Sequence, residues 1–181
     1  MVVVTQGREL SENQKLIFNK IWGSARNKSE DIFSRKDLRP QDLYFFLHTE
    51  DTCVAVGRLR EIPDVYLEKE LWKIPVWGMS SISVDPKYQK SGLGKKLVEE
   101  IKNYAVKNKL CIIGFYDKKS SLDWFYRKCG FEVNDQMGKS FLIKTGDEIK
   151  DNCDEAVLYF KNDPLIAEIF KNKKVYIPYT W

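Results

Sequence analysis

The stretch Val76–Lys96, VWGMSSISVDPKYQKSGLGKK, decides the fold of this 181-residue chain. Residues 76–84 are mostly apolar or small, which predicts a strand. The strand ends at Asp85-Pro86, because proline has no N–H to donate and restricts the residue before it. Two glycines then stand where an amphipathic segment begins. The sequence therefore predicts a glycine-containing turn between a strand and a helix.

The segment after this turn completes a strand–helix–strand unit. Residues 92–108 carry apolar side chains at every fourth position and charged ones between them, as in an amphipathic helix. Residues 110–116, LCIIGFY, form an almost continuous apolar run, which is typical of a strand covered on both faces. We expect a parallel strand pair joined by a right-handed crossover.

The residues before this unit predict a helix and a hairpin. Ser11 and Gln14 fit a capping box that opens a helix. The β-prone runs 43–48 and 53–60 are separated by four polar residues, so they predict an antiparallel hairpin.

The residues after the unit predict short elements. A helix over 120–128 is expected to turn Leu122, Phe125 and Tyr126 inward, and Gly130 fits its left-handed end. Further strands are expected over 141–143, 156–160 and 175–179, with a helix after Asp163-Pro164. The fold class is thus α/β (mixed), with one domain over 1–181, whose best-supported part is 76–135 and whose least assigned part is 136–181.

Composition limits the function classes. With 43% hydrophobic and 31% charged residues and a net charge of +4, the chain is typical of a globular protein without the clustered charge of a nucleic-acid binder. We expect no membrane span and no targeting segment, and hence a cytoplasmic protein. Four cysteines far apart and one histidine predict neither a disulfide framework nor a metal site.

The turn at Gly92 and Gly94 is suited to binding an anion, because glycines let a ligand approach the backbone and the first N–H groups of a helix point toward it. Two common phosphate loops do not fit. A Walker A loop would need Gly at position 89 and Ser or Thr at 96, and a dinucleotide fingerprint would need Gly at 97; Gln89, Lys96 and Leu97 stand there.

The remaining pattern, Q-x-x-G-x-G over 89–94, resembles the acetyl-CoA pyrophosphate loop of the GNAT superfamily of N-acetyltransferases. Its surroundings agree: Val84-Asp85-Pro86 precedes it, as a V-x-P-like turn does in the family. The later stretch 126–131, YRKCGF, matches the family's tyrosine before a G-F step.

The resemblance implies acetyl-CoA as acyl donor, no metal, and a central twisted sheet with a splayed parallel pair. Backbone groups of Ile82, Ser83 and Val84 would pair with the pantetheine arm. Tyr126 would protonate the departing CoA sulfur. The pyrophosphate would rest on the amides of the loop residues, namely Gln89, Lys90, Ser91, Gly92, Leu93, Gly94 and Lys95.

The sequence departs from the family at the base. Many members carry a glutamate on the strand before the loop, where this chain has residues 78–81, GMSS. Ser80 or Ser81 could hold a water chain, or Glu61 or Asp64 could reach the amine. The asparagine often found before the tyrosine helix is replaced by Lys119.

The expected acceptor is a primary amine of a small molecule, similar to a polyamine or an amino sugar. Acidic residues over 147–154 would attract a cation, although a solvated loop explains them as well. The terminal Trp181 is similar to the C-terminal end of aminoglycoside acetyltransferases, where the chain's end helps to bind the amino sugar. This resemblance implies that Trp181, in addition to Ser80, contacts the substrate. The alternatives are a protein lysine or N-terminal acetyltransferase, a non-catalytic acyl-CoA-binding module and a plain interaction domain. Edge strands near the C-terminus would allow a homodimer.

Overall fold

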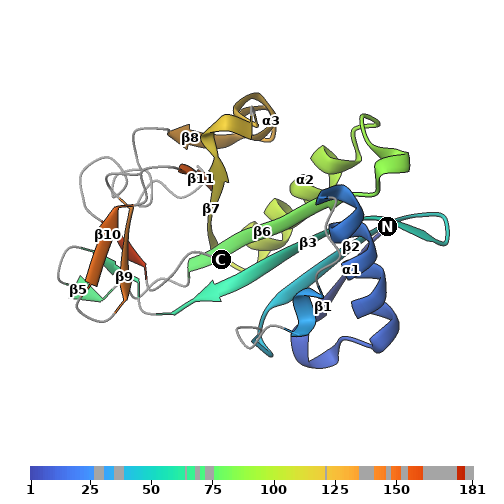
Figure 1. Cartoon of the computed structure of the whole chain (residues 1–181), viewed down its shortest axis with the longest axis horizontal. Helices are drawn as coiled ribbons and strands as arrows, with labels where there is room; N and C mark the ends of the chain where they lie inside the picture. Colours follow the sequence, from blue (N-terminus) through green and yellow to red (C-terminus); the bar gives the residue numbers. More distant parts are fainter. Residues whose placement is uncertain are drawn as a thin grey trace. The chain divides into compact units, whose positions relative to one another are not determined.

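The computed structural model describes most of the chain as helices, strands and their connections (Figure 1). The described residues are 1–26, 31–34, 39–63, 65–67, 70–71, 76–120, 122–134, 141–145, 148–151, 155–160 and 175–177. Their contacts group the chain into two compact units, one of residues 1–60 and 79–103 and one of residues 61–78 and 104–181. No helix among the described residues is long and apolar enough to cross a membrane.

The first unit holds four neighbouring strands in the order β1-β2-β3-β6 (Figure 1). Their bounds are β1 Val2–Gln6, β2 Leu43–Thr49, β3 Thr52–Ile62 and β6 Val76–Val84. Strand β2 pairs antiparallel with β3, as the hairpin prediction required, and also with β1. Strand β1 has no counterpart among the predicted elements.

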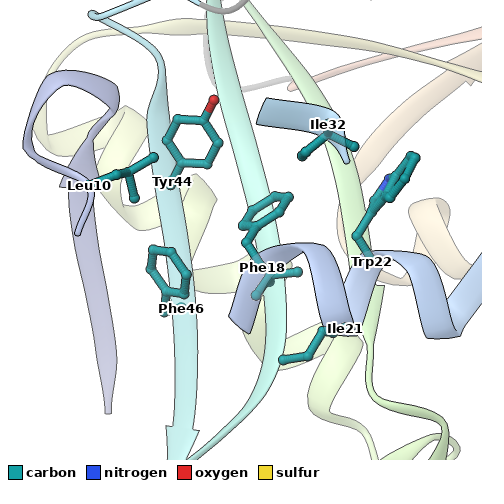
Figure 2. Close-up of a cluster of buried hydrophobic side chains, with 8 residues drawn as sticks. Leu10, Phe18, Ile21, Trp22, Ile32, Tyr44 and Phe46 are labelled. Carbon is teal, nitrogen blue, oxygen red and sulfur yellow. The ribbon is translucent and has the colours of Figure 1, made fainter. Parts of the chain in front are cut away.

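Helix α1, Glu12–Arg26, begins at the predicted capping box. The backbone N–H of Gln14 donates to Ser11 Oγ at 3.2 Å, and that of Ser11 donates to Gln14 Oε1 at 3.0 Å. The helix packs Phe18, Ile21 and Trp22 against Tyr44 and Phe46 of β2 and against Val56 of β3 (Figure 2). The Phe18 and Tyr44 rings meet edge to face, 5.3 Å between centroids. This aromatic cluster is the core on one face of the sheet.

Helix α2, Leu93–Lys107, covers the opposite face. Val56 packs into the α1 cluster, and the next residue, Gly57, lies against Leu97 and Ile101 of α2. Both of these α2 side chains are completely buried. Consecutive strand residues project to opposite faces, so α1 and α2 sandwich this part of the sheet.

The second unit holds three strands in the order β7-β11-β8 and a five-stranded sheet in the order β10-β9-β12-β4-β5. All pairs within them are antiparallel except β9 with β12, which is parallel. Helix α3, Asp123–Lys128, lies between β7 and β8 along the chain. The strand bounds are β4 Tyr66–Leu67, β5 Glu70–Leu71, β7 Cys111–Asp117, β8 Phe131–Asn134, β9 Phe141–Thr145, β10 Glu148–Asp151, β11 Glu155–Phe160 and β12 Val175–Ile177. Short 3₁₀ turns are Gly7–Glu9, Ile32–Ser34, Pro86–Tyr88 and Lys118–Ser120.

The mixed α/β class is confirmed, and the predicted strands over 76–84, 110–116, 141–143 and 156–160 all form. Residues 175–177 form the described part of the predicted last strand, and the helix expected after Asp163-Pro164 lies outside the described residues. The inward position predicted for Leu122 is wrong, because its side chain is 37% exposed. Leu122 stands at the N-cap of α3, before the helical turn whose spacing directs Tyr126 into the core.

Candidate active site

The turn after β6 is held by hydrogen bonds within the turn and by one to strand β3. The N–H of Asp85 donates to the Val54 carbonyl of β3 at 2.9 Å, and its carboxylate accepts from the N–H of Lys87 at 2.9 Å. The Gln89 amide group reaches back to the Val84 carbonyl at 3.2 Å, and the Ser91 hydroxyl donates to the Tyr88 carbonyl. These bonds fix the path from the strand to the helix without using the first amides of α2.

The start of α2 has the features that an anion requires. Its first bond from one turn to the next runs from the N–H of Lys96 to the Gly92 carbonyl at 3.1 Å, so the N–H groups of Leu93, Gly94 and Lys95 precede the helical ladder. Gly92 has a φ of +82°, which a residue with a side chain rarely adopts. A Cβ built at Gly92 meets no protein atom within 4 Å. The backbone is therefore open to a ligand at the predicted phosphate position.

Basic side chains accompany this turn. Lys87, Lys90, Lys95 and Lys96 are all exposed, and Lys95 forms a surface pair with Glu99 at 3.5 Å. A fifteen-residue helix adds partial positive charge at its N-terminus. The turn and helix start thus combine positive charge with an open backbone, as a site for an anionic group does.

A buried polar cluster lies on the α1 face of β2, β3 and β6. Arg58 Nε donates to Ser80 Oγ at 3.1 Å, and Arg58 also hydrogen-bonds to Tyr44. Burial lowers the pKa of Arg58, and burial raises the pKa of Tyr44. Next to them Arg60 Nε donates to Asp42 Oδ2 at 3.0 Å, with side chains 1% and 0% exposed. Burial raises the pKa of Asp42 although both arginines oppose the shift.

Tyr126 lies in the second unit, on α3, and is 8% exposed. Its ring packs against Tyr116 of β7 at 5.4 Å and against Phe131 of β8 at 6.1 Å between centroids. The Tyr116 hydroxyl hydrogen-bonds to Asp123 on the first turn of the same helix. Gly130, at a φ of +79°, turns the chain from α3 into β8 as predicted. Strands on both sides of α3 therefore hold the Tyr126 ring in place.

The other predicted site residues are placed as follows. Ile82 and Val84 are partly exposed at the end of β6, and Ser83 is buried. Lys119 is exposed, and its N–H donates to the Asp117 carboxylate at 2.8 Å. Trp181 and Asp64 lie outside the described residues. None of the three described cysteines, Cys53, Cys111 and Cys129, forms a disulfide.

Sequence reasoning missed Arg58 and the conformation of Ser81. Ser81 has a φ of +56° inside β6, a left-handed conformation that nothing in GMSSIS announces. A signal for Arg58 did exist, because Arg58 and Arg60 interrupt the otherwise apolar stretch 54–60, VAVGRLR, at alternate positions. That pattern places two cations on one face of a buried strand.

Comparison with known proteins agrees with this geometry. Residues 40–133, just over half of the chain, match the family model described as an acetyltransferase (GNAT) domain. The chain therefore belongs to the GNAT family, and it is an acetyl-CoA-dependent N-acetyltransferase. No curated protein matches it significantly.

Solved structures share the fold at low sequence identity. The chain is similar to a ribosomal-protein-alanine N-acetyltransferase from Escherichia coli, with 16% identity, a TM-score of 0.59, and coverage of 88% of this chain and 93% of that one. Escherichia coli ElaA has 13% sequence identity and a TM-score of 0.61, and the match covers 88% of this chain and 98% of ElaA. A Bacillus subtilis acetyltransferase in complex with CoA has 20% sequence identity and a TM-score of 0.56, and the match covers 88% of this chain and 98% of that one. At these identities the likeness establishes the shared fold.

Proposed function

We propose that this chain transfers the acetyl group of acetyl-CoA to a primary amine of a small molecule, of polyamine or amino-sugar type, by direct attack in a ternary complex. The observation that carries the proposal is the open helix start at Gly92, with its left-handed backbone and the amides of residues 93–95. Acetyl-CoA supplies the activated acyl group.

In this proposal the chain's own groups have separate tasks. The amides after Gly92 bind the pyrophosphate, and backbone groups of Ile82, Ser83 and Val84 align the pantetheine arm. The neutral amine nitrogen forms a bond to the thioester carbon as the carbon–sulfur bond breaks, and Tyr126 donates its phenolic proton to the CoA sulfur. The proton that the acetylated nitrogen loses returns through water to the Tyr126 oxygen, so the phenol is restored. Proton transfer by a positioned side chain contributes about 10² to 10⁴-fold to a rate.

The acceptor class rests on the sequence, where carboxylates are concentrated over 147–154. A small di- or polyamine carries positive charge that such residues attract. The test of this part is a screen of polyamines, aminoglycosides and peptides with free N-termini or lysines. Turnover of peptides alone would replace the small-molecule acceptor by a protein.

Donor binding is tested by thermal unfolding with and without acetyl-CoA. A ligand at 100 times its dissociation constant stabilises the folded state by about 2.7 kcal/mol, which raises the Tm of a protein of this size by about 5–10 °C. Gly92→Val should abolish most of this shift, because its side chain would occupy the space open to the ligand. Lys109→Val is the matched control, since Lys109 also has a positive φ, +55°, but lies beyond the other end of α2. Both variants should lower the Tm of the ligand-free protein, and only Gly92→Val should lose the ligand shift.

The role of Tyr126 is tested by Tyr126→Phe, with Tyr116→Phe as the control that removes a hydroxyl from the neighbouring ring. We expect kcat to fall about 10²-fold or more in the first variant and only slightly in the second, with acetyl-CoA binding retained in both. Equal activities of Tyr126→Phe and the wild type would remove Tyr126 from the mechanism. Binding without turnover by the wild type on every acceptor would indicate a non-catalytic acyl-CoA-binding module.

A further inference from the structure

Strand β6 changes the face of its side chains at Ser81. In a regular strand, residues two apart project to the same face. Ser80 Oγ accepts a hydrogen bond from Arg58, whereas Ile82 Cδ1 lies 2.8 Å from the position of a Cβ built on Gly57. Gly57 and Arg58 are consecutive in β3 and project to opposite faces. Ser80 therefore points to the α1 face and Ile82 to the α2 face.

The pairing of β6 with β3 shows the same irregularity. The hydrogen bond from the N–H of Asp85 to the Val54 carbonyl places these residues opposite each other. Counting along the antiparallel pair from there puts Arg58 opposite Ser81, yet its side chain bonds to Ser80. One extra residue is therefore accommodated at Ser81, as in a β-bulge.

This bulge needs support, because a left-handed serine is strained relative to glycine. The Arg58 side chain stabilises the bulge, and the residue Arg58 is 7% exposed. Its guanidinium bonds to Ser80 of β6 and to Tyr44 of β2, and Tyr44 is 1% exposed. A planar guanidinium that is buried and hydrogen-bonded to two partners holds Ser80 on the α1 face. It thereby determines at which residue the side chains of β6 change from one face of the sheet to the other.

We propose that Arg58 is a positioning residue for acetyl-CoA, which holds the bulge at Ser81 through Ser80 and thereby sets the backbone of Ile82–Val84. This inference rests on the proposed function, which assigns that backbone to the pantetheine arm. Arg58 acts from the side of β6 that faces α1, through two serines, and is not itself a ligand of the donor.

The experiment measures the dissociation constant of acetyl-CoA by calorimetry, and the Tm without ligand, for four single substitutions and one double variant. Arg58→Met and Ser80→Ala should each weaken binding about tenfold. The double variant should be no weaker than Arg58→Met, because both substitutions remove the same hydrogen bond, that between Arg58 and Ser80. Ser80→Thr keeps the hydroxyl and should bind as the wild type does. Thr52→Ala, which removes an exposed hydroxyl at the far end of β3, is the matched control and should leave binding unchanged.

The deciding variant is Ser81→Gly in the Arg58→Met background. Glycine adopts a positive φ without strain, so it should restore most of the lost affinity if Arg58 acts by holding the bulge. If Arg58 contributed only to stability, Arg58→Met would lower the Tm, and Ser81→Gly would not restore the affinity for acetyl-CoA.

Wild-type affinity in Arg58→Met, or a loss that Ser81→Gly does not reverse, would overturn the inference and leave the proposed function standing. Absence of acetyl-CoA binding in the wild type would instead refute the proposed function. If Arg58→Met does not fold, Ser80→Ala alone and with Ser81→Gly gives the same comparison, because it deletes a single hydroxyl.

Discussion

Replacing Gly57 by alanine should destabilise the protein by an amount that the packing of α2 on β3 determines. A Cβ at Gly57 would lie 2.8 Å from Ile82 Cδ1, 3.1 Å from Ile101 Cδ1 and 3.5 Å from Leu97 Cδ2. Ile101 and Leu97 are completely buried, so neither can move into solvent. Alanine gains about 0.5–1 kcal/mol over glycine in a strand, whereas overpacking costs about 1–3 kcal/mol. We expect a net loss of about 1–2 kcal/mol.

The assay is urea unfolding of Gly57→Ala, Ile82→Val and the double variant. Ile82→Val removes the Cδ1 atom that the new methyl group would meet, at a cost of about 0.5–1.5 kcal/mol on its own. The double variant should therefore be more stable than the sum of the two losses predicts, by about 1 kcal/mol. Ile21→Val is the control, because Ile21 packs on the α1 face, and its loss should add to that of Gly57→Ala within about 0.5 kcal/mol.

Two outcomes would refute this reasoning. If Gly57→Ala is as stable as the wild type, the helix yields without cost and the contact is not tight. If the losses from Gly57→Ala and Ile82→Val simply add, the two side chains do not compete for the same space.

Two further predictions concern ionisable groups that are taken out of water, the buried Asp42 and the half-buried Cys53. Asp42→Ala should lower the free energy of unfolding, measured by urea denaturation, by about 3–5 kcal/mol, because it leaves the Arg60 guanidinium without the carboxylate at 3.0 Å. The control is Glu12→Ala, at the exposed pair with Lys15, which should change the free energy of unfolding by less than about 1 kcal/mol. Equal losses in the two variants would contradict burial as the cause. Burial raises the pKa of the Cys53 thiol from 9.0 to about 11, so the folded state keeps a proton that the unfolded state loses, and this contribution to stability falls as the pH rises from about 9 to 11. Iodoacetamide at pH 8 should label Cys53 about a hundredfold more slowly in the native protein than in urea, as read by peptide mass spectrometry, and comparable rates would show that the thiol is not shielded.

The sequence was sufficient wherever the signal was local. The capping box at Ser11 and Gln14 reports two hydrogen bonds within four residues, and both are formed. The strand-turn-helix at 76–107 was equally predictable, since proline restricts the backbone and glycine allows the positive φ of a turn, whatever the rest of the chain does. The loop residues of the candidate site belong to this class.

Elements that depend on a distant partner were not predictable in the same way. Residues 2–6 become strand β1 because β2, some forty residues later, offers its edge to them. Strands β4 and β5 have two residues each, and β4 pairs with β5 on one side and with β12 on the other. A window of local sequence contains none of these partners.

The bulge in β6 extends this argument to the site itself. Left-handed strand residues are usually glycine, and this strand does contain a glycine, Gly78, three positions before Ser81. The bulge lies at Ser81 because the guanidinium of Arg58 hydrogen-bonds to Ser80. Arg58 is held in this position because it also hydrogen-bonds to Tyr44, which packs against α1. The backbone geometry of the proposed donor strand is thus set by side chains of two neighbouring strands. A substitution in β2 or β3 that never touches the donor should therefore change how tightly the donor binds.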